Sequence, residues 1–308
     1  MDISSILSLL QTSVELGLVS SLTVLALFLS YTMLNVCDLS TDGCFTLGAA
    51  VGAVVALSGH PFLSIPAAML AGVTSGFITG ILQTKMGIDS LLSGIIVNTA
   101  LYSINIAIMG NSSLINLNKT ETVFTMLKTA LSGTSMAGMY KAVIAVIAVA
   151  ATVIFLALFL STRLGLAIRA TGNNPDMVRS SSINPVFTTL VGLCVANAFT
   201  ALSGCMLGQL QKSVNIDIGT GMVTMALASL LIGRAFLGRG KITTRAIGAV
   251  LGAVIFRIVY AVALRFNMPA FMLKFVSSVI VIIAISGPYL KSRIPVIKRR
   301  LSAKKARA

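Results

Sequence analysis

The sequence predicts an all-α membrane protein, a polytopic bundle of about nine helical spans, and three observations point to this class. Of 308 residues, 56% are hydrophobic and 10% are charged, a composition that does not describe a soluble domain. The mean hydropathy is +0.97. The apolar runs are roughly 20 residues long, enough for a helix to cross a hydrocarbon core of about 30 Å, and they lack the alternation of barrel strands. Residues 1–308 are therefore expected to form a single transmembrane domain.

Nine apolar runs are expected to become the spans. In order, they cover residues 16–34, 43–59, 64–83, 90–109, 141–162, 186–209, 219–235, 246–264 and 272–290. Gly219 and Gly221 open the seventh run, so residues 211–222 are also compatible with a segment that dips back into the membrane. The longest polar interruption, residues 110–140, is too short to bury a core of its own, which excludes an attached ATPase or receptor domain.

The distribution of lysine and arginine predicts the orientation of these spans. With the N-terminus outside, sixteen of the 23 basic residues fall on the cytoplasmic side, six fall on the outer side, and Arg257 lies within the eighth span. Because basic residues accumulate in short cytoplasmic loops, an outside N-terminus and a cytoplasmic C-terminus are expected. A charge in mid-span is costly. Arg257 is therefore expected to mark a cavity, to pair with a carboxylate, or to lie nearer the surface.

The formal net charge is +15, and half of this excess lies in the C-terminal tail, residues 291–308. This tail follows a span on the expected cytoplasmic side, where an anionic lipid surface attracts basic segments. Contact with the lipid bilayer, or with an acidic cytoplasmic subunit, explains the charge, so no nucleic-acid partner is expected. The four cysteines show no CxxC spacing, and neither a disulfide framework nor a metal site is indicated.

Glycines recur at every fourth residue on several of the expected spans. The third span carries Gly72, Gly76 and Gly80, and pairs with the same spacing are Gly48 and Gly52, Gly204 and Gly208, and Gly248 and Gly252. Removing the side chains from one helical face lets two backbones approach closely, which is how helices associate in lipid. The spacing predicts tight packing within one subunit rather than a dimer face.

Polar residues form a stripe along the fourth span. Asn98, Tyr102 and Asn105 lie at positions i, i+4 and i+7, on one side of a helix that is otherwise apolar. Such groups cannot face lipid without hydrogen-bond partners. The stripe therefore either makes interhelical hydrogen bonds or lines a translocation path, with Asn197 of the sixth span as a companion.

Two acidic residues, Asp38 and Asp42, bracket the junction between the first two spans. Asn, Asp, Ser and Gly residues in this junction break one helix and cap the next. Thr41 or Asp42 is expected to accept hydrogen bonds from the amides at the start of the second span. A direct part for Asp38 and Asp42 in passing the solute is the alternative interpretation.

The cytoplasmic segment 165–184, between the fifth and sixth spans, is longer than a hairpin requires and predicts a short helix. Asn174 fits an N-cap, Pro175 the first helical position, and Asp176 the first turn, where a negative charge meets the positive end of the helix dipole. The pair Asn184-Pro185 is expected to end this helix before the sixth span. The helix is either an ordinary loop helix or a surface that another protein grips.

These residues also carry a family resemblance. The stretch RATGNNPDMVR (169–179) resembles the coupling region of permease subunits of branched-chain amino acid and ribose ABC importers. The junction DLSTDG (38–43) resembles the DLSxGS element of that class, with the additional Asp42 where an apolar residue is usual. FTLGAA (45–50) and ALYSINIAIMG (100–110) look most like the tryptophan/tyrosine transport permease subgroup. The resemblance covers about residues 8–286.

This resemblance implies a permease subunit of an ATP-driven importer in the bacterial cytoplasmic (inner) membrane, which conducts a small solute of the aromatic or another amino acid class. The implied partners are an ABC ATPase dimer, a second permease copy forming a homodimer, and an extracytoplasmic substrate-binding lipoprotein. No cofactor is expected in this chain, because ATP and Mg would be bound by the ATPase. The implied coupling residues are Arg169, Gly172, Asn174, Pro175, Asp176, Met177 and Arg179.

Two other function classes are less compatible with the sequence. An intramembrane enzyme would need a catalytic signature, but there is no HExxH motif, and the single histidine, His60, stands beside Pro61 in a short loop. GRGK (238–241) lacks the glycine and the hydroxyl residue of a phosphate loop. An ion-coupled secondary transporter working without an ATPase is the alternative function, although carboxylates are scarce in the later spans.

Overall fold

The computed structural model describes residues 3–130, 139–238 and 240–265, together with positions 275, 278, 279, 281, 282 and 286. The elements in order are α1 (Ile3–Leu27), the π-helix η1 (Phe28–Met33), α2 (Thr41–Leu57), α3 (Ser64–Thr84), α4 (Ser90–Ile108), β1 (Leu114–Asn116), α5 (Val123–Ala130), α6 (Tyr140–Ser161), α7 (Arg163–Asn173), α8 (Pro175–Ser180), α9 (Pro185–Gln211), β2 (Ser213–Asn215), α10 (Met222–Leu237) and α11 (Ile242–Arg265). The all-α prediction is confirmed, with one very small sheet added.

Six helices of the described part are long and apolar enough to cross a membrane. They are Ser8–Met33, Ser64–Thr84, Ser90–Ile108, Tyr140–Ser161, Pro185–Gln211 and Ile242–Ala263, and α2 and α10 are shorter apolar helices. Eight of the nine expected spans therefore coincide with helices. Most of the expected ninth span, residues 272–290, and all of the basic tail, residues 291–308, lie outside the described residues.

The first span is longer than the sequence analysis predicted. Its helix begins at Ile3 rather than near residue 16, because polar side chains that interrupt the apolar run bond to their own helix. Thr12 Oγ1 donates to the Ser8 carbonyl at 2.9 Å, and Ser13 Oγ donates to the Leu9 carbonyl at 2.6 Å. At its other end, α1 widens into η1 before Asn35 takes a positive φ of 56° and turns the chain.

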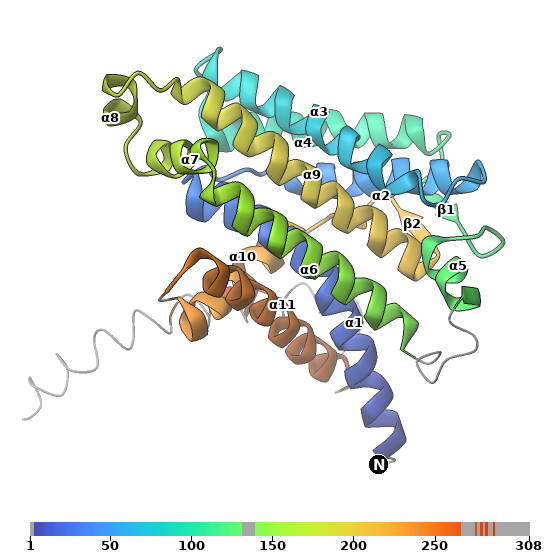
Figure 1. The fold of residues 1–308 in the computed structure, drawn as a ribbon. Helices are drawn as coiled ribbons and strands as arrows, with labels where there is room; N and C mark the ends of the chain where they lie inside the picture. The colour runs from blue at the N-terminus through green and yellow to red at the C-terminus, as the bar shows by residue number, and fades with distance from the viewer. Residues whose placement is uncertain are drawn as a thin grey trace, which may run out of the picture.

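The helices run roughly side by side, and α9 lies in the middle of the bundle (Figure 1). It packs against α1, α2 and α3, and most of α9 and of the span Ser8–Met33 is buried. The helices α7 and α8 lie at one end of the bundle, whereas β1, β2 and α5 lie at the other (Figure 1). The core of the protein is therefore a pair of enclosed helices, α1 and α9, with the remaining spans arranged around them.

Glycine allows the closest helix contacts, as the spacing predicted. A Cβ atom at Gly48 would collide with a backbone oxygen of α9, and so would a Cβ atom at Gly72 or Gly76. On α11, a Cβ atom at Gly252 would collide with the carbonyl oxygen of Ser229 on α10. The expectation of tight packing within the subunit is confirmed, because these contacts join helices of one chain.

The two short apolar helices begin partway along the bundle rather than at its end. Gly48 faces Ala201, and Gly52 faces Cys205, so α2 runs parallel to α9 with a constant offset. The start of α2 is then about nine residues, or about 14 Å, along α9 from its first residue. Gly219 lies against Asp42, which places the start of α10 at the same depth. Discontinuous helices of this kind are a feature of transporter binding sites.

The segment between α9 and α10 turns back into the bundle, which was one of the two expectations for residues 211–222. Lys212 takes a positive φ of 54°, after which β2 pairs antiparallel with β1 and residues 216–221 form turns. In the register of this pair, Ile115 lies opposite Val214, and both side chains are buried. The polar interruption at residues 110–140 thus contains the strand β1 and the helix α5. Because β1 follows α4 and pairs with β2, it holds the end of α4 beside this turn.

Candidate functional site

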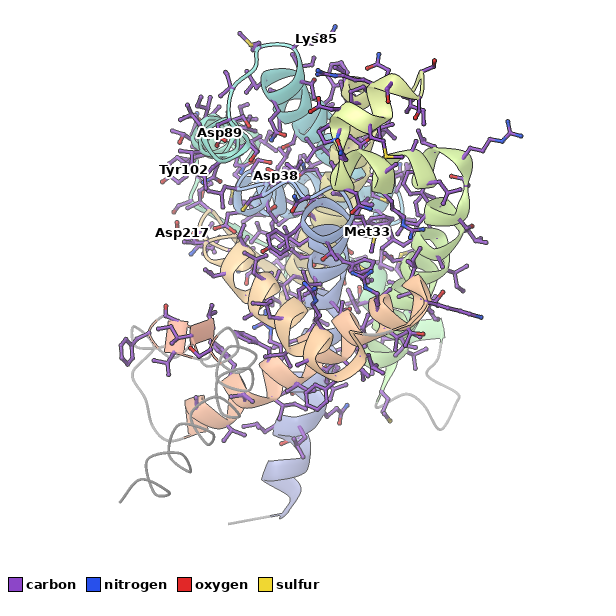
Figure 2. All side chains as sticks on the ribbon, turned by 90° about the vertical axis from the view of Figure 1, so that its left-hand side faces the viewer. Met33, Asp38, Lys85, Asp89, Tyr102 and Asp217 are labelled. Atoms are coloured by element: carbon purple, nitrogen blue, oxygen red, sulfur yellow. The ribbon has the colours of Figure 1, made fainter. Side chains whose placement is uncertain are left out.

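A polar cavity of about 380 Å³ lies where α2, α4 and the 216–221 turn meet. Its lining residues are Asp42, Gly43, Thr46, Asn98, Thr99, Tyr102, Ser103, Asn105, Ile216, Asp217 and Thr220. Viewed from the α7–α8 end of the bundle, Tyr102 and Asp217 lie near one edge, whereas Asp38 lies deeper inside (Figure 2). Six residues were candidates for the translocation path. The fold brings four of them together in this cavity from two separate stretches of sequence: Asp42, Asn98, Tyr102 and Asn105.

The polar stripe of α4 faces this cavity in two different ways. Asn105 is 1% exposed, and its Nδ2 donates to the Gly43 carbonyl at 3.1 Å, so it joins α4 to α2. Tyr102 is 52% exposed and Asn98 is half-buried, so both are accessible from the cavity. The stripe was expected either to make interhelical hydrogen bonds or to line a path. Asn105 makes such a hydrogen bond, while Tyr102 and Asn98 are open to the cavity.

Asp42 caps a helix other than its own. Its Oδ2 accepts from the Gly221 amide at 2.9 Å, and its Oδ1 accepts from the Val223 amide at 2.8 Å. These are orphan donors at the start of α10, where a negative charge is also favoured by the helix dipole. The expectation that Thr41 or Asp42 caps α2 is wrong: Ser40 is the N-cap of α2, and it makes no side-chain cap bond.

Asp38 and Asn197 lie outside the cavity and bind each other. Asp38 is 2% exposed, its Oδ2 accepts from Asn197 Nδ2 at 2.8 Å, and its Oδ1 accepts from the amide and the hydroxyl of Ser40 at 2.8 and 2.6 Å. This arrangement fixes the junction between η1 and α2 to the middle of α9. Asn197 is thus a companion of Asp38 and not of the α4 stripe.

Replacing Asn197 with alanine is expected to lower the free energy of unfolding by about 2 kcal/mol, because a buried carboxylate loses a charge-assisted hydrogen bond. Thermal unfolding in detergent can be followed with a thiol-reactive fluorophore, since Cys44 and Cys205 are free and buried. Thr200→Ala is the matched control: Thr200 is buried on the same helix but bonds only to the Ala196 carbonyl. Equal melting temperatures for the two variants would contradict the assignment.

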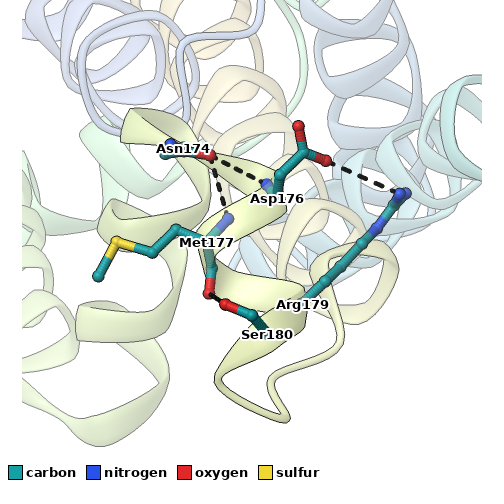
Figure 3. Close-up of polar contacts among 5 residues, drawn as sticks. All are labelled: Asn174, Asp176, Met177, Arg179 and Ser180. Atoms are coloured by element: carbon teal, nitrogen blue, oxygen red, sulfur yellow. Dashed lines mark hydrogen bonds and ion pairs between the residues drawn. The ribbon is translucent and has the colours of Figure 1, made fainter.

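The segment 165–184 belongs to two helices rather than one. Thr162 caps α7, and its Oγ1 accepts from the Gly165 amide at 3.2 Å. Asn174 caps α8, and its Oδ1 accepts from the amides of Asp176 and Met177, both at 3.1 Å (Figure 3). The predicted start of α8 at Asn174 and Pro175 is confirmed, whereas α7 was not foreseen.

The far end of α8 differs from the prediction. The helix ends at Ser180, and Ser182 takes a positive φ of 59° to reverse the chain. Asn184 and Pro185 then start α9, with Asn184 Oδ1 accepting from the Val186 amide at 3.0 Å, so their role is to begin a helix rather than to end one.

The exposed surface of α8 carries Met177 and a weak ion pair. Met177 is 65% exposed, and Asp176 Oδ1 lies 4.0 Å from Arg179 Nη1 (Figure 3). An exposed pair at this distance contributes little stability. The side chains of Asp176, Met177 and Arg179 are therefore available to a partner, while Val178 is buried and anchors the helix.

Gly172 connects this segment to the membrane helices. A Cβ atom at Gly172 would collide with the carbonyl oxygen of Met33, the last residue of η1. The backbone of α7 at Gly172 thus contacts the backbone of η1 at Met33 without an intervening side chain. Arg169, one turn earlier on α7, is half-buried. From Met33 the chain runs directly to Asp38 and then to Asp42 at the polar cavity, so the α7–α8 end of the bundle and the cavity are linked through a few residues.

Arg257 is bound by a hydroxyl rather than a described carboxylate. Its Nη2 and Nε donate to Ser20 Oγ at 2.9 and 3.2 Å, and its guanidinium lies 5.9 Å from the centre of the Tyr260 ring. It borders a cavity of about 420 Å³ beside the start of α10. Of the three expectations for this residue, marking a cavity is the one that the structure confirms.

Gly219 and Asp217 also belong to the site, although neither was predicted from the sequence. A Cβ atom at Gly219 would collide with the Asp42 carbonyl oxygen, so only glycine lets the turn approach α2. Asp217 lies two residues after the end of β2 and lines the same cavity. The only signal in the sequence was the pair Gly219 and Gly221, which marked a break in the seventh run.

Known proteins resemble this chain over most of its length. A tyrosine transport system permease protein of Clostridioides difficile is 31% identical over 267 residues, which cover 86% of each chain. An uncharacterized protein of Rickettsia prowazekii is 26% identical over 286 residues, covering 91% of this chain and 98% of that protein. A nucleoside ABC transporter permease protein of Lactococcus lactis is 28% identical over 180 residues, covering 52% of this chain and 48% of that protein.

No solved structure matches the chain. The family described as the permease component of the branched-chain amino acid transport system matches residues 9–285. That range contains the bundle, the polar cavity and the α7–α8 segment. The chain therefore belongs to the branched-chain amino acid transport permease family and is a transmembrane permease subunit of an ABC importer.

Proposed function

We propose that two copies of this chain face each other across α4 and enclose the path of the solute in the polar cavity between them. The observation that carries this proposal is the exposed polar face of α4, where Tyr102 and Ser103 are exposed beside Asn98. Hydroxyl and amide groups do not face hydrocarbon without partners. A second copy, or water held between two copies, supplies partners that lipid does not.

The geometry of the cavity supports a path through it. Both α2 and α10 begin at its depth, so helix N-termini, a carboxylate, amides and a phenol converge there. Asp42, Asn98, Tyr102 and Asn105 are the residues proposed to line the path. Asp38 and Asn197, which do not reach the cavity, are proposed to act by holding the junction that places Asp42.

The proposed solute is a small molecule of the amino acid class, and an aromatic amino acid is favoured. The support is the name of the Clostridioides difficile relative, a tyrosine transport system permease, and the aromatic and amide side chains of the cavity. Tyr102 can stack on an aromatic ring, and Asn98 can exchange hydrogen bonds with a zwitterion. Selection among amino acids is proposed to reside mainly in the receptor that delivers the solute.

The proposed energy source is a separate ATPase dimer that binds ATP and Mg, so this chain carries no bond chemistry of its own. The α7–α8 segment, with Arg169, Gly172, Asn174, Pro175, Asp176, Met177 and Arg179, is proposed to seat in a groove of the ATPase. Closure of the nucleotide domains then moves this segment and exchanges inward for outward access. An extracytoplasmic substrate-binding lipoprotein completes the complex.

The proposed setting is the bacterial cytoplasmic membrane, with nine spans, the N-terminus outside and the C-terminus inside. The support for this orientation is the excess of basic residues in the loops assigned to the cytoplasmic side. The segment that contains α8 is one of these loops, and α8 lies at one end of the bundle (Figure 1). In this orientation β1, β2 and α5 are on the outer side, and the whole chain, residues 1–308, forms one domain.

Replacing Tyr102 with alanine is expected to reduce uptake into proteoliposomes about tenfold, a loss of roughly 1.4 kcal/mol in solute contact, without changing the melting temperature. The assay uses the complete complex with its ATPase and receptor and labelled tyrosine. Ile96→Ala is the control, because Ile96 is exposed on α4 and does not line the cavity. Equal uptake by both variants would show that the polar face of α4 does not line the path of the solute.

Accumulation of solute against a gradient by the purified chain alone would contradict the need for an ATPase. This result would instead support the ion-coupled secondary transporter. We expect no accumulation until the ATPase and ATP are present.

A further inference from the structure

A second cavity, of about 500 Å³, lies on another part of the surface, between α3, α5, α6 and α9. We call it the apolar groove. Met69, Leu127, Ile147, Phe155 and Phe199 are among its lining residues. Ile147 is 60% exposed and Phe155 is 47% exposed, whereas Phe199 is 5% exposed. The groove therefore opens sideways along α6 and has its floor on α9.

The apolar groove offers no free polar group to a solute or to water. Its two polar side chains are those of Thr152 and Gln209. Thr152 Oγ1 donates to the Ala148 carbonyl at 2.9 Å. Gln209 Nε2 donates to Ser64 Oγ at 2.6 Å, and its Oε1 accepts from the Val123 amide at 3.0 Å. Because apolar cavities exclude water, the occupant of the groove is itself apolar.

The floor of the groove is held in a fixed shape by aromatic packing. The rings of Phe155 and Phe199 meet edge to face with their centres 5.5 Å apart, and Phe155 also stacks on Phe159 at 5.8 Å. Such pairs have preferred geometries and resist collapse of the space between them. The groove is therefore a formed site rather than a gap that neighbouring side chains can close.

Two lysines stand at the end of the groove formed by α5. Lys128 follows the lining residue Leu127, and Lys141 lies one turn before the lining residue Ile144. Their Nζ atoms are 5.9 and 6.0 Å from the centre of the same Tyr140 ring. Neither forms an ion pair with a described carboxylate. A tyrosine flanked by lysines at the end of a span is typical of the level of lipid headgroups.

The groove and the polar cavity lie on different sides of the bundle. In the view along the helices, α4 lies at one side, where Asp89 and Tyr102 mark it, and α6 lies at the other (Figure 2). The neighbours of α4 are α2 and α3, not α6. A second copy that faces α4 therefore leaves the apolar groove open to the bilayer.

We propose that the apolar groove binds an anionic phospholipid, with an acyl chain lying on the Phe155–Phe199 floor and the phosphate between Lys128 and Lys141. The positive charges of the two lysines complement the negative phosphate. The apolar groove runs along the helices, where the acyl chain would lie, and the lysines stand at its end, where the headgroup would lie. This proposal rests on the proposed orientation of the protein in one respect only: with the N-terminus outside, the bound lipid belongs to the outer leaflet.

The first test measures lipid retained by the purified full chain. Native mass spectrometry in detergent, with phosphatidylglycerol or phosphatidylcholine of matched acyl chains added, gives the number and strength of bound lipids. We expect one phosphatidylglycerol per chain. Ala151→Phe, which fills the groove, is expected to lower its retention about tenfold. Ala150→Phe is the control, because Ala150 is exposed on α6 but is not a lining residue. Equal retention by the two variants would overturn the proposal.

The second test concerns the headgroup. Replacing both Lys128 and Lys141 with glutamine is expected to reduce the preference for phosphatidylglycerol over phosphatidylcholine about thirtyfold, because about 1 kcal/mol per lysine is lost. Lys85→Gln is the control: Lys85 is an exposed lysine at the opposite end of the bundle. An unchanged preference in the double variant would remove the lysines from the site.

The third test identifies the occupant in a membrane. A phosphatidylglycerol with a photoactivatable acyl chain is expected to label α6 and α9 at Phe155 and Phe199. Crosslinks between two permease chains at these positions, without lipid labelling, would show instead that a second copy covers the groove. None of these measurements depends on uptake, so the lipid site and the transport path can fail independently.

Discussion

Replacing both Pro175 and Asp176 with glycine is expected to lower ATP-driven uptake at least about tenfold while the protein stays in the membrane. Glycine is about 1 kcal/mol less favourable than alanine within a helix, and it does not fix φ at the first helical position as Pro175 does. Loss of the Asp176 charge removes about 0.3–1 kcal/mol of dipole interaction as well. A helix of only six residues is marginal even before this loss. The proposed coupling surface at α8 is then expected to be disordered, although the spans are untouched.

The measurement pairs uptake with ATP hydrolysis in the reconstituted complex. Hydrolysis is expected to continue without matching uptake, which is the signature of uncoupling. Ser181→Gly with Ser182→Gly is the matched control, because these residues follow α8 and Ser182 already has the positive φ that glycine favours. If the variant with a weakened helix and this control transported equally well, α8 would not be the coupling element.

Replacing Asp42 with alanine is expected to lower the free energy of unfolding by about 3 kcal/mol and to abolish uptake. The amides of Gly221 and Val223 lose the acceptors that satisfy them at 2.9 and 2.8 Å. Val223 is buried, and a buried donor without a partner costs roughly 1–3 kcal/mol. The start of α10 is then no longer fixed beside α2, so the polar cavity loses one of its walls.

Asp217→Ala is the control for this prediction. Asp217 lines the same cavity, and its described hydrogen bond involves its backbone amide rather than its carboxylate. We expect the melting temperature of this variant to match that of the unmodified protein, as followed with the thiol-reactive fluorophore. A destabilisation of equal size in both variants would show that carboxylate charge in the cavity, and not the cap at α10, is what matters.

The sequence was sufficient for features that depend on neighbours along the chain. Helix α8 begins where the Asn174-Pro175 pair predicts, because an N-cap and a proline at the first helical position act within three residues. The glycine spacing of α3 predicted a close contact for the same reason: every fourth residue lies on one face of any helix. Both signals are independent of how the spans are arranged.

Pairings across the fold could not be predicted in this way. Asp42 caps a helix that begins 179 residues later, and Asp38 binds Asn197 at a separation of 159 residues. The sequence shows an acidic residue near a helix start, and the nearest helix was the natural choice for its partner. Only the parallel packing of α2 on α9, and the return of the 216–221 turn, bring the true partners together.

The contact between Gly172 and Met33 has a mechanical consequence. Repulsion between two backbones rises steeply on approach, whereas the attraction that resists their separation is only about 0.1–0.2 kcal/mol per atom pair. A displacement of α7 toward the membrane is therefore passed to the end of η1 almost without loss, but a withdrawal is not. Across this contact α7 can push η1 but cannot pull it, so a pull on the bundle has to pass through the other links of α7: its direct continuation from α6, and the hydrogen bond of 2.8 Å between Thr171 Oγ1 and Thr188 Oγ1 on α9.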